Sequence, residues 1–144
     1  MKTQISILLM LPLLLFHNTA TGQAERTFVK SFNLQSRQTV VLNLGDNVQT
    51  TTWDNDVMRI QMTVSLASTN DATLKALAES GRYMLKSDLD LQNLTVTTPN
   101  LHNAIKVNGI ELRETLTFMV FVPKSVTVLK NSEANSKIVA KLNP

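Results

Sequence analysis

Two carboxylates in a short polar stretch are the first residues of this sequence whose type and spacing suggest chemistry. Asp54 and Asp56 flank Asn55 in the segment TTWDNDVMRI. Alternating carboxylates can supply the oxygen ligands of a calcium site, but an EF-hand loop needs ligands across twelve residues, with a glycine at the sixth and a glutamate at the twelfth. Here the acidic stretch ends at Asp56, and Asp and Asn also favour turns. We therefore predict a turn between two strands, with Asp54 and Asp56 as weak candidates for metal ligands.

Hydrolytic catalysis would need a nucleophile beside a positioned base. His102 is the one histidine after residue 24, and no G-x-S-x-G motif surrounds any serine. Glu111 and Glu114 are the nearest pair of carboxylates, but three residues apart on one predicted strand they would point to opposite faces. We predict no catalytic residues and a protein that is not an enzyme; a hydrolase whose site is not visible in the sequence is an alternative.

The remaining chemistry-bearing residues give few signals. The sequence has no cysteine and four scattered glycines, which argues against a transition-metal site or a phosphate-binding loop, so we predict no cofactor. Trp53 and Tyr83 are the candidates for ligand contact, because exposed aromatic rings can form a platform for sugars. Aromatic residues in strands nevertheless belong more often to the core, which is where we place Trp53.

Alternation of apolar and polar residues governs most of the chain and predicts strands. The clearest strand carries Met58, Ile60, Met62, Val64 and Leu66 on one face. The segment 116–122, LTFMVFV, is apolar on both faces, which suits a central strand covered on both sides. Other predicted strands cover 27–34, 39–44, 48–53, 84–98, 126–130 and, more weakly, 137–142.

Two segments depart from this pattern. Asn70 or Asp71 can cap a helix whose apolar residues have helical spacing, and Gly81 is a natural stop. Further on, Asn108-Gly109 separates two alternating arms and predicts a two-residue hairpin, with Val107 opposite Ile110, Lys106 opposite Glu111 and Ile105 opposite Leu112.

The amino terminus has the pattern of an export signal. Lys2 precedes an apolar run of twelve residues, 5–16, which is shorter than the roughly 20 residues of a spanning helix. We predict cleavage after Ala24, with cleavage after Gly22 as the second choice. The predicted organisation is therefore a signal peptide, 1–24, and a single β-rich domain, 25–144. No cysteine follows the signal, so no lipid anchor of the usual bacterial kind is expected, and no stable membrane anchor remains after cleavage.

Charge and cysteine content limit the possible partners. Removing residues 1–24 lowers Lys+Arg from 14 to 13 against 11 Asp+Glu, which leaves a net charge of +2 without a basic block. Nucleic-acid binding therefore has no electrostatic basis. A small exported domain without disulfides must rely on burial and strand pairing, which favours a bacterial envelope protein.

The order of these elements and two local motifs resemble a known family. The motifs are an LKxLxxxGRYxLKS pattern from Leu74 to Ser87 and a VPKSVTV segment from Val122 to Val128. The chain resembles small exported proteins of Bacteroidota related to adhesin-like β-strand-repeat domains, including auto-transporter adhesin head domains, a family of unknown function. The resemblance covers most of residues 25–144 and implies an exported, β-rich protein.

These observations lead to one prediction of fold and one of function. The predicted fold is all-β, a mostly antiparallel β-sandwich of about seven to nine strands with one short α-helix; the alternative is a short β-strand-repeat solenoid. The predicted function is that of a non-enzymatic, exported cell-envelope or secreted module, periplasmic or at the cell surface, which binds or adheres to a protein or glycan partner. A periplasmic regulatory or stress-linked protein that docks to another envelope protein is the alternative.

Overall fold

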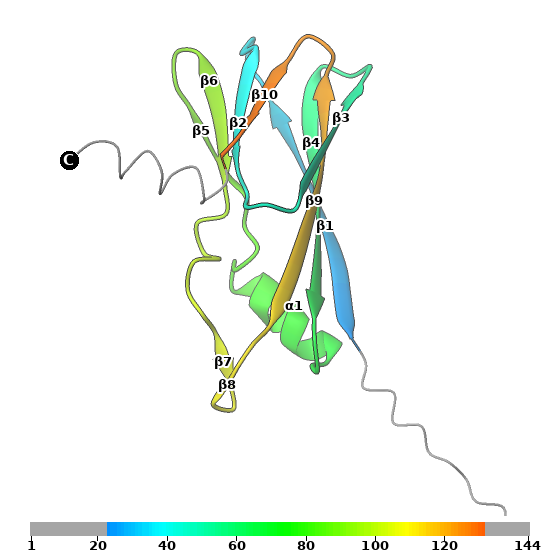
Figure 1. Cartoon of the computed structure of the whole chain (residues 1–144), viewed down its shortest axis with the longest axis vertical. Coiled ribbons are helices and arrows are strands. Elements are labelled where there is room, and N and C mark those ends of the chain that lie inside the picture. The colour runs from blue at the N-terminus through cyan, green and yellow to red at the C-terminus, as the bar shows by residue number, and fades with distance from the viewer. Residues whose placement is uncertain (1–22, 132–144) are drawn as a thin grey trace, which may run out of the picture.

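The computed structural model describes residues 23–131, which form two facing β-sheets with a short helix at one end (Figure 1). The helix is α1 (Asp71–Glu79), and a separate hairpin contains β7 (Lys106–Val107) and β8 (Ile110–Glu111). The predicted all-β sandwich with one short helix is thus confirmed. In spatial order, sheet A consists of β1 (Ala24–Asn33), β4 (Val57–Leu66), β9 (Glu114–Pro123) and β3 (Val48–Trp53), and sheet B of β10 (Thr127–Lys130), β2 (Thr39–Asn43), β6 (Asn93–Thr97) and β5 (Lys86–Leu89).

Strand pairing is mixed. The pairs β1–β4, β4–β9, β5–β6 and β7–β8 are antiparallel, whereas β2 runs parallel to both β10 and β6, and β3 runs parallel to β9. Side-chain alternation is the same in both kinds of ladder, so the parallel pairs were not predictable from the pattern. The two sheets hold eight strands, within the predicted seven to nine. The predicted strand at 137–142 lies outside the described residues.

The core lies between the two sheets. The face of β4 that was predicted from period two is buried throughout, because all five of its apolar side chains have 0% exposure. Sheet B contributes the apolar side chains of its two inner strands, β2 and β6. The hydrophobic effect therefore fixes which face of each strand points inward, and a slip of one residue would turn the whole apolar set outward. The contributing residues of sheet B are Val40, Leu42, Leu94 and Val96.

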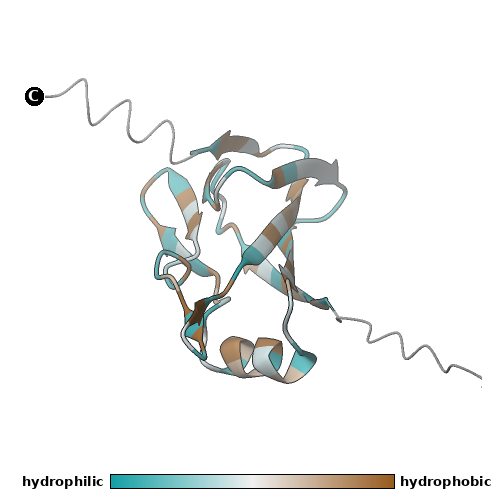
Figure 2. Ribbon diagram, turned by 60° about the horizontal axis from the view of Figure 1, so that its bottom comes forward, coloured by the Kyte–Doolittle hydropathy of each residue, from teal (hydrophilic) through white to brown (hydrophobic). Residues whose placement is uncertain are grey.

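The helix closes the lower end of the sandwich, next to the hairpin (Figures 1 and 2). The Asn70 side chain accepts a hydrogen bond from the Thr73 backbone N–H at 2.9 Å, which satisfies one of the unpaired donors of the first turn. Leu74 is fully buried beneath the sheets, and Gly81 follows the helix with φ +81°. The predicted cap and stop are confirmed. No helix in the described part of the chain is long and apolar enough to cross a membrane.

The hairpin has the predicted register. Val107 lies opposite Ile110 and Lys106 opposite Glu111, and the Leu112 N–H donates to the Ile105 carbonyl at 2.8 Å. Its two central residues have positive φ, Asn108 at 52° and Gly109 at 80°, as a type I′ turn requires.

Strand β9 corrects one prediction. It lies inside sheet A, between β4 and β3, but only one of its faces is buried. On the other face Met119 and Phe121 are half-buried, and Thr115 and Thr117 are exposed. This face has no covering layer among the described residues, because the second sheet packs on the opposite side.

The turn predicted at residues 54–56 is confirmed, but the strands that it joins are not neighbours. Strand β3 ends at Trp53 and β4 begins at Val57, while β9 lies between them in the sheet. The turn therefore passes over the end of β9, and the Trp53 indole N–H donates to the Val57 carbonyl at 2.9 Å across it. The placement of Trp53 in the core was wrong: its ring is half-buried on the outer side of sheet A.

Candidate functional site

The outer face of sheet A presents side chains in regular rows that run across the strands. Residues that are paired on neighbouring strands lie side by side, so the register of the sheet defines these rows. Above a row of Glu25, Ser65 and Thr115 at the hairpin end, three rows follow: the first is Thr27, Thr63 and Thr117; the second is Val29, Gln61, Met119 and Gln49; the third is Ser31, Arg59, Phe121 and Thr51.

The rows combine hydroxyl and amide groups with a few apolar surfaces. Within the first row, the Thr27 and Thr63 hydroxyls are hydrogen-bonded at 2.9 Å. Consecutive rows are separated by two residues along each strand, or about 7 Å, and four strands span about 14 Å. The rows of Thr27 and of Val29 thus offer neutral donors and acceptors on the scale of a few sugar rings or a short extended chain, and the next row adds the Arg59 guanidinium.

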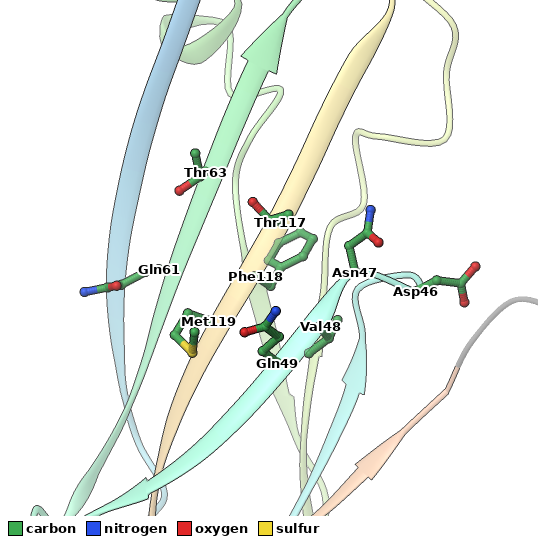
Figure 3. A pocket seen from close by; sticks show the side chains of 9 residues that line it. All are labelled: Asp46, Asn47, Val48, Gln49, Gln61, Thr63, Thr117, Phe118 and Met119. Carbon is green, nitrogen blue, oxygen red and sulfur yellow. The ribbon is translucent and has the colours of Figure 1, made fainter.

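A hollow of about 470 Å³ lies on this face where β3 begins (Figure 3). Thr63 and Gln61 border it from β4, Thr117 and Met119 from β9, and the segment 46–49 from the start of β3. Among the described residues, the lining contributes one carboxylate, Asp46, and no cation. Most of its polar groups are amides and hydroxyls, which can both donate and accept hydrogen bonds.

An aromatic cluster borders the same face one row beyond the hollow. The Trp53 ring lies 5.4 Å from the Phe121 ring, centroid to centroid, and the Arg59 guanidinium lies 4.9 Å from the Trp53 ring. The indole N–H already donates to the backbone of the turn, so the two rings offer apolar surface, and the Arg59 guanidinium supplies the charged donors of the cluster. Trp53, a predicted candidate for ligand contact, therefore lies on the same face as the hollow.

The structure separates the other predicted site residues from this face. Tyr83 is buried with 5% exposure, so its ring is not an open platform. Asp54 and Asp56 are exposed in the turn, where the Asp54 carboxylate pairs with the Lys124 ammonium at 2.6 Å. No group of three or more His, Cys, Asp or Glu side chains that could hold a metal ion occurs in residues 23–131. His102 is exposed in the loop between β6 and β7.

The interpretation of Glu111 and Glu114 as two residues of one strand was wrong. Glu111 ends β8 in the exposed hairpin, whereas Glu114 begins β9, and its side chain is 9% exposed. The Glu114 carboxylate forms a salt bridge with the Arg82 guanidinium and accepts a hydrogen bond from the Tyr83 hydroxyl at 2.6 Å.

These three residues, Arg82, Tyr83 and Glu114, form a buried polar cluster that we call the clamp. Arg82 also donates to the Asn100 and Asn103 carbonyls at 3.1 and 3.0 Å, and thereby holds the loop that leads to the hairpin. Burial raises the pKa of Glu114, but the hydrogen bonds from Arg82 and Tyr83 and the charge of Arg82 outweigh it, so the pKa lies below its ordinary value. Burial raises the pKa of the Tyr83 phenol.

The shifts in the clamp keep the carboxylate ionised and the phenol protonated at neutral pH. A general acid or base works best with a pKa near the working pH, and neither group is moved toward it. The arrangement therefore joins the α1–β5 segment to β9 and the 100–103 loop. Sequence reasoning missed the clamp because Glu114 lies 32 residues from Arg82 and 31 from Tyr83, and no local pattern links it to them.

A second hollow, of about 880 Å³, lies between the turn after β4 and the β7–β8 hairpin. Thr69 and Asn70 border it on one side, and Val107, Ile110 and Leu112 on the other. Its lining is more apolar than that of the first hollow, and one wall is the two-stranded hairpin, which pairs with neither sheet. We regard the first hollow as the candidate site because the two central strands of sheet A, β4 and β9, position five of its nine lining residues.

Comparisons with known proteins add little to this picture. No protein-family model matches the sequence, and no curated protein matches it. Among solved structures, the chain is similar to the crystal structure of a putative cell adhesion protein from Clostridium sporogenes, with a TM-score of 0.39 and 10% identity. The match covers 74% of this chain and 45% of the other, so the chain spans less than half of that protein's length. A similarity at this level does not establish a shared activity, and the family resemblance noted above stays a prediction.

Proposed function

We propose that this protein is an exported, non-enzymatic binding module that holds a neutral glycan on the outer face of sheet A. The observation that carries the proposal is the hollow bordered by Gln61, Gln49, Thr63 and Thr117. Amide and hydroxyl side chains on fixed strands match the hydroxyl groups of a sugar, since both partners donate and accept hydrogen bonds. The hollow itself carries one exposed carboxylate, Asp46, and no cation, which disfavours anionic polymers there. The Arg59 guanidinium lies one row beyond the hollow.

Apolar surface on the same face supports a sugar ligand over a small polar solute. Met119 lies within the hollow, and the Phe121 and Trp53 rings follow along the same strands. Sugar rings have apolar C–H faces that pack against such surfaces, while their hydroxyls reach the amides. A linear oligosaccharide that extends along β9 would contact the hollow first and the aromatic cluster next.

Titration with defined oligosaccharides tests the proposal. The sequence contains a single tryptophan, so the fluorescence of Trp53 reports on the aromatic end of the site, and amide NMR shifts report on the hollow. We expect a panel of neutral β- and α-linked oligosaccharides to contain a ligand that changes the amide NMR shifts of Gln49, Gln61 and Thr117. Anionic oligosaccharides of the same length should bind more weakly.

A pair of matched variants localises the binding. The double variant Gln61→Ala/Thr117→Ala removes two polar groups from the hollow, whereas Thr39→Ala/Thr95→Ala makes a comparable change on the outer face of sheet B. We expect the first to lower affinity by about tenfold, since each lost hydrogen bond contributes about 0.5–1.5 kcal/mol, and the second to leave it unchanged. Equal affinity in both variants, or no binding by any neutral glycan, would reject the proposal.

Export is the second part of the proposal. The position of Ala24 supports cleavage after Gly22 over cleavage after Ala24. Ala24 begins β1 opposite Leu66 and is buried with 7% exposure. Cleavage after Gly22 leaves this residue in the strand, while cleavage after Ala24 removes it. The mass of the mature protein from the native host distinguishes these products, and fractionation with protease treatment of intact cells separates a periplasmic from a surface location. An uncleaved cytoplasmic protein would contradict export.

A further inference from the structure

The four edge strands of the sandwich differ in how they are protected against pairing with other chains. Unpaired backbone groups at a sheet edge can template further strands, and charged side chains are a common safeguard. Strand β1 carries Glu25, Arg26 and Lys30, strand β5 carries Lys86 and Asp88, and strand β10 carries Lys130. Among these edges of the described structure, β3 alone has no charged residue in its sequence VQTTTW.

The backbone of β3 shows which of its groups face the free edge. In a parallel ladder, alternate residues bond to the neighbouring strand, and the residues between them direct N–H and C=O to the other side. The Phe118 N–H donates to the Asn47 carbonyl at 2.9 Å, so the odd-numbered residues of β3 face β9. Val48, Thr50 and Thr52 consequently face the free edge, where Thr50 and Thr52 are exposed.

One of these three positions is already satisfied within the chain. The Val48 N–H donates to the Asp46 carbonyl at 3.0 Å, and the Val48 carbonyl accepts from the Lys130 ammonium at 2.8 Å. Lys130 reaches it because it lies opposite the buried Leu42 and so points between the sheets. The edge is thereby capped at Val48, and the N–H and C=O groups of Thr50 and Thr52 have no partner within residues 23–131.

We propose that β3 pairs antiparallel with β3 of a second copy of this chain, about a two-fold axis at Thr51. In that register Thr50 faces the partner's Thr52, and each such pair exchanges two hydrogen bonds. The two symmetric pairs use all the free groups of both copies and none of the capped ones. The pairing joins two four-stranded sheets into one of eight strands.

Charge supports a second copy as the occupant. The segment Gln49–Thr52 is neutral, so self-pairing brings no like charges together, and threonine pairs are favourable cross-strand neighbours. At the ends of the segment, the same register places Val48, with Lys130 at its carbonyl, opposite the partner's Asp54. The Asp54 carboxylate of one copy, which is paired with Lys124 of its own chain, thus lies toward Lys130 of the other copy. If the proposed glycan site is also correct, the dimer carries the first hollow of each copy on one continuous face, since that hollow is bordered by Asn47 and Gln49 at β3.

Sedimentation velocity of the mature protein without glycan tests the pairing, so its outcome is independent of the glycan proposal. We expect a concentration-dependent monomer–dimer equilibrium. The variant Thr50→Lys/Thr52→Lys sets lysine against lysine and should weaken association about tenfold or more, whereas Thr50→Lys/Thr52→Glu sets opposite charges together and should restore it to within about threefold of wild type. A parallel pairing would oppose like charges in both variants, so loss of association in both would reject the register.

Circular dichroism first checks that each variant is folded. Three further outcomes would overturn the proposal. A protein that is monomeric at every concentration, with the Thr50 and Thr52 amides exchanging rapidly, has an open edge. A monomer in which these amides are protected has the edge covered by its own residues outside 23–131. A dimer that both charge variants leave unchanged uses another surface. Slow exchange of these two amides in the dimer, and faster exchange in the lysine variant, is the expected result.

Discussion

Lys30 and Lys130 occupy equivalent places on opposite sides of the sandwich. Each lies on an edge strand, is paired with a buried residue of the next strand and therefore points inward, Lys30 opposite Ile60 and Lys130 opposite Leu42. Each ammonium bonds a backbone carbonyl from the other layer of the sandwich, Lys30 that of Leu85 at 2.7 Å and Lys130 that of Val48 at 2.8 Å. The sequence thus uses the same device twice to close the two open sides.

The two sides differ in what surrounds the lysine. On the β1 side, the segment between α1 and β5 crosses the opening, Tyr83 stacks on Phe28 at 5.5 Å, and the clamp fixes that segment to β9. On the β3 side, Lys130 caps one end of the edge, and Thr50 and Thr52 beyond it remain exposed. One side is sealed by packing, and the other keeps backbone groups available for a partner. The comparison indicates that the contacts on the β1 side mainly stabilise the fold, whereas the β3 side is the one available for association.

The largest expected effect comes from breaking the clamp. Replacing Arg82 with alanine leaves the buried Glu114 carboxylate without its ion pair and frees the 100–103 loop. Removal of one partner from a buried ion pair costs about 3–5 kcal/mol, a large part of the stability of a domain of this size. Urea unfolding should show this loss. The matched control is Arg26→Ala, which removes the exposed pair with Asp71 and should cost about 1 kcal/mol or less.

Equal losses of unfolding free energy in the two arginine variants would contradict the comparison, because the clamp would then stabilise the β1 side no more than an exposed ion pair does. Association gives an independent check. A folded fraction of Arg82→Ala at low temperature should sediment as the wild type does, since the β3 edge is unchanged.

Acid should weaken the sealed side through the same carboxylate. The pKa of Glu114 is lower in the folded protein than in the unfolded chain, where it has its ordinary value. The stability that Glu114 contributes is therefore fully present above the ordinary pKa and is lost as the pH falls through the lowered one. Unfolding free energies measured between pH 7 and about pH 3 should fall more steeply in wild type than in Glu114→Gln, which cannot titrate. Parallel pH profiles would show that the clamp does not depend on the charge of Glu114.

The two lysines give a smaller and more direct test. Lys30→Met and Lys130→Met keep the aliphatic stem and remove the bond to the carbonyl. We expect Lys30→Met to cost about 1–2 kcal/mol, because it loses both a hydrogen bond and the contact of its ammonium with the Phe32 ring at 5.3 Å. Lys130→Met should cost about 1 kcal/mol and should weaken dimerisation, because the charge that faces Asp54 of the partner subunit is lost. Thermal unfolding and sedimentation distinguish the two variants.

Much of the fold was predictable because burial imposes local patterns. The alternation of residues 58–66, the cap at Asn70 and the Asn108-Gly109 turn each contain their own signal within a few residues, and the structure confirms all three. The order of strands in each sheet was not predictable. The interposition of β9 between β3 and β4 depends on pairs of residues that are 48 to 70 positions apart in the sequence, and parallel and antiparallel ladders share the same period.

The candidate site was predictable only in part. Trp53 could be named from its type, but its place on the outer face follows from the turn over β9, which no local signal specifies. Gln61 and Thr117 look like ordinary solvent-facing residues in their own strands, and they gain significance only when the register sets them beside the same hollow. Sites assembled from unremarkable polar residues on separate strands leave no motif, unlike a metal site or a nucleophile with its base.

The smallest expected effect concerns the acidic turn at the end of the open edge. Asp54→Asn/Asp56→Asn removes two exposed carboxylates and the pair with Lys124, which at 68% and 84% side-chain exposure contributes about 0–1 kcal/mol. Asn55, which accepts from the Val57 N–H at 3.3 Å, still shapes the turn. The melting temperature should therefore change little and should be insensitive to millimolar calcium in both proteins. A calcium-dependent rise in wild type that the variant lacks would establish a cation site at the turn. The variant also removes the charge opposite the partner's Lys130, which predicts weaker dimerisation. If dimerisation weakens while the melting temperature is unchanged, the turn contributes to association and not to stability.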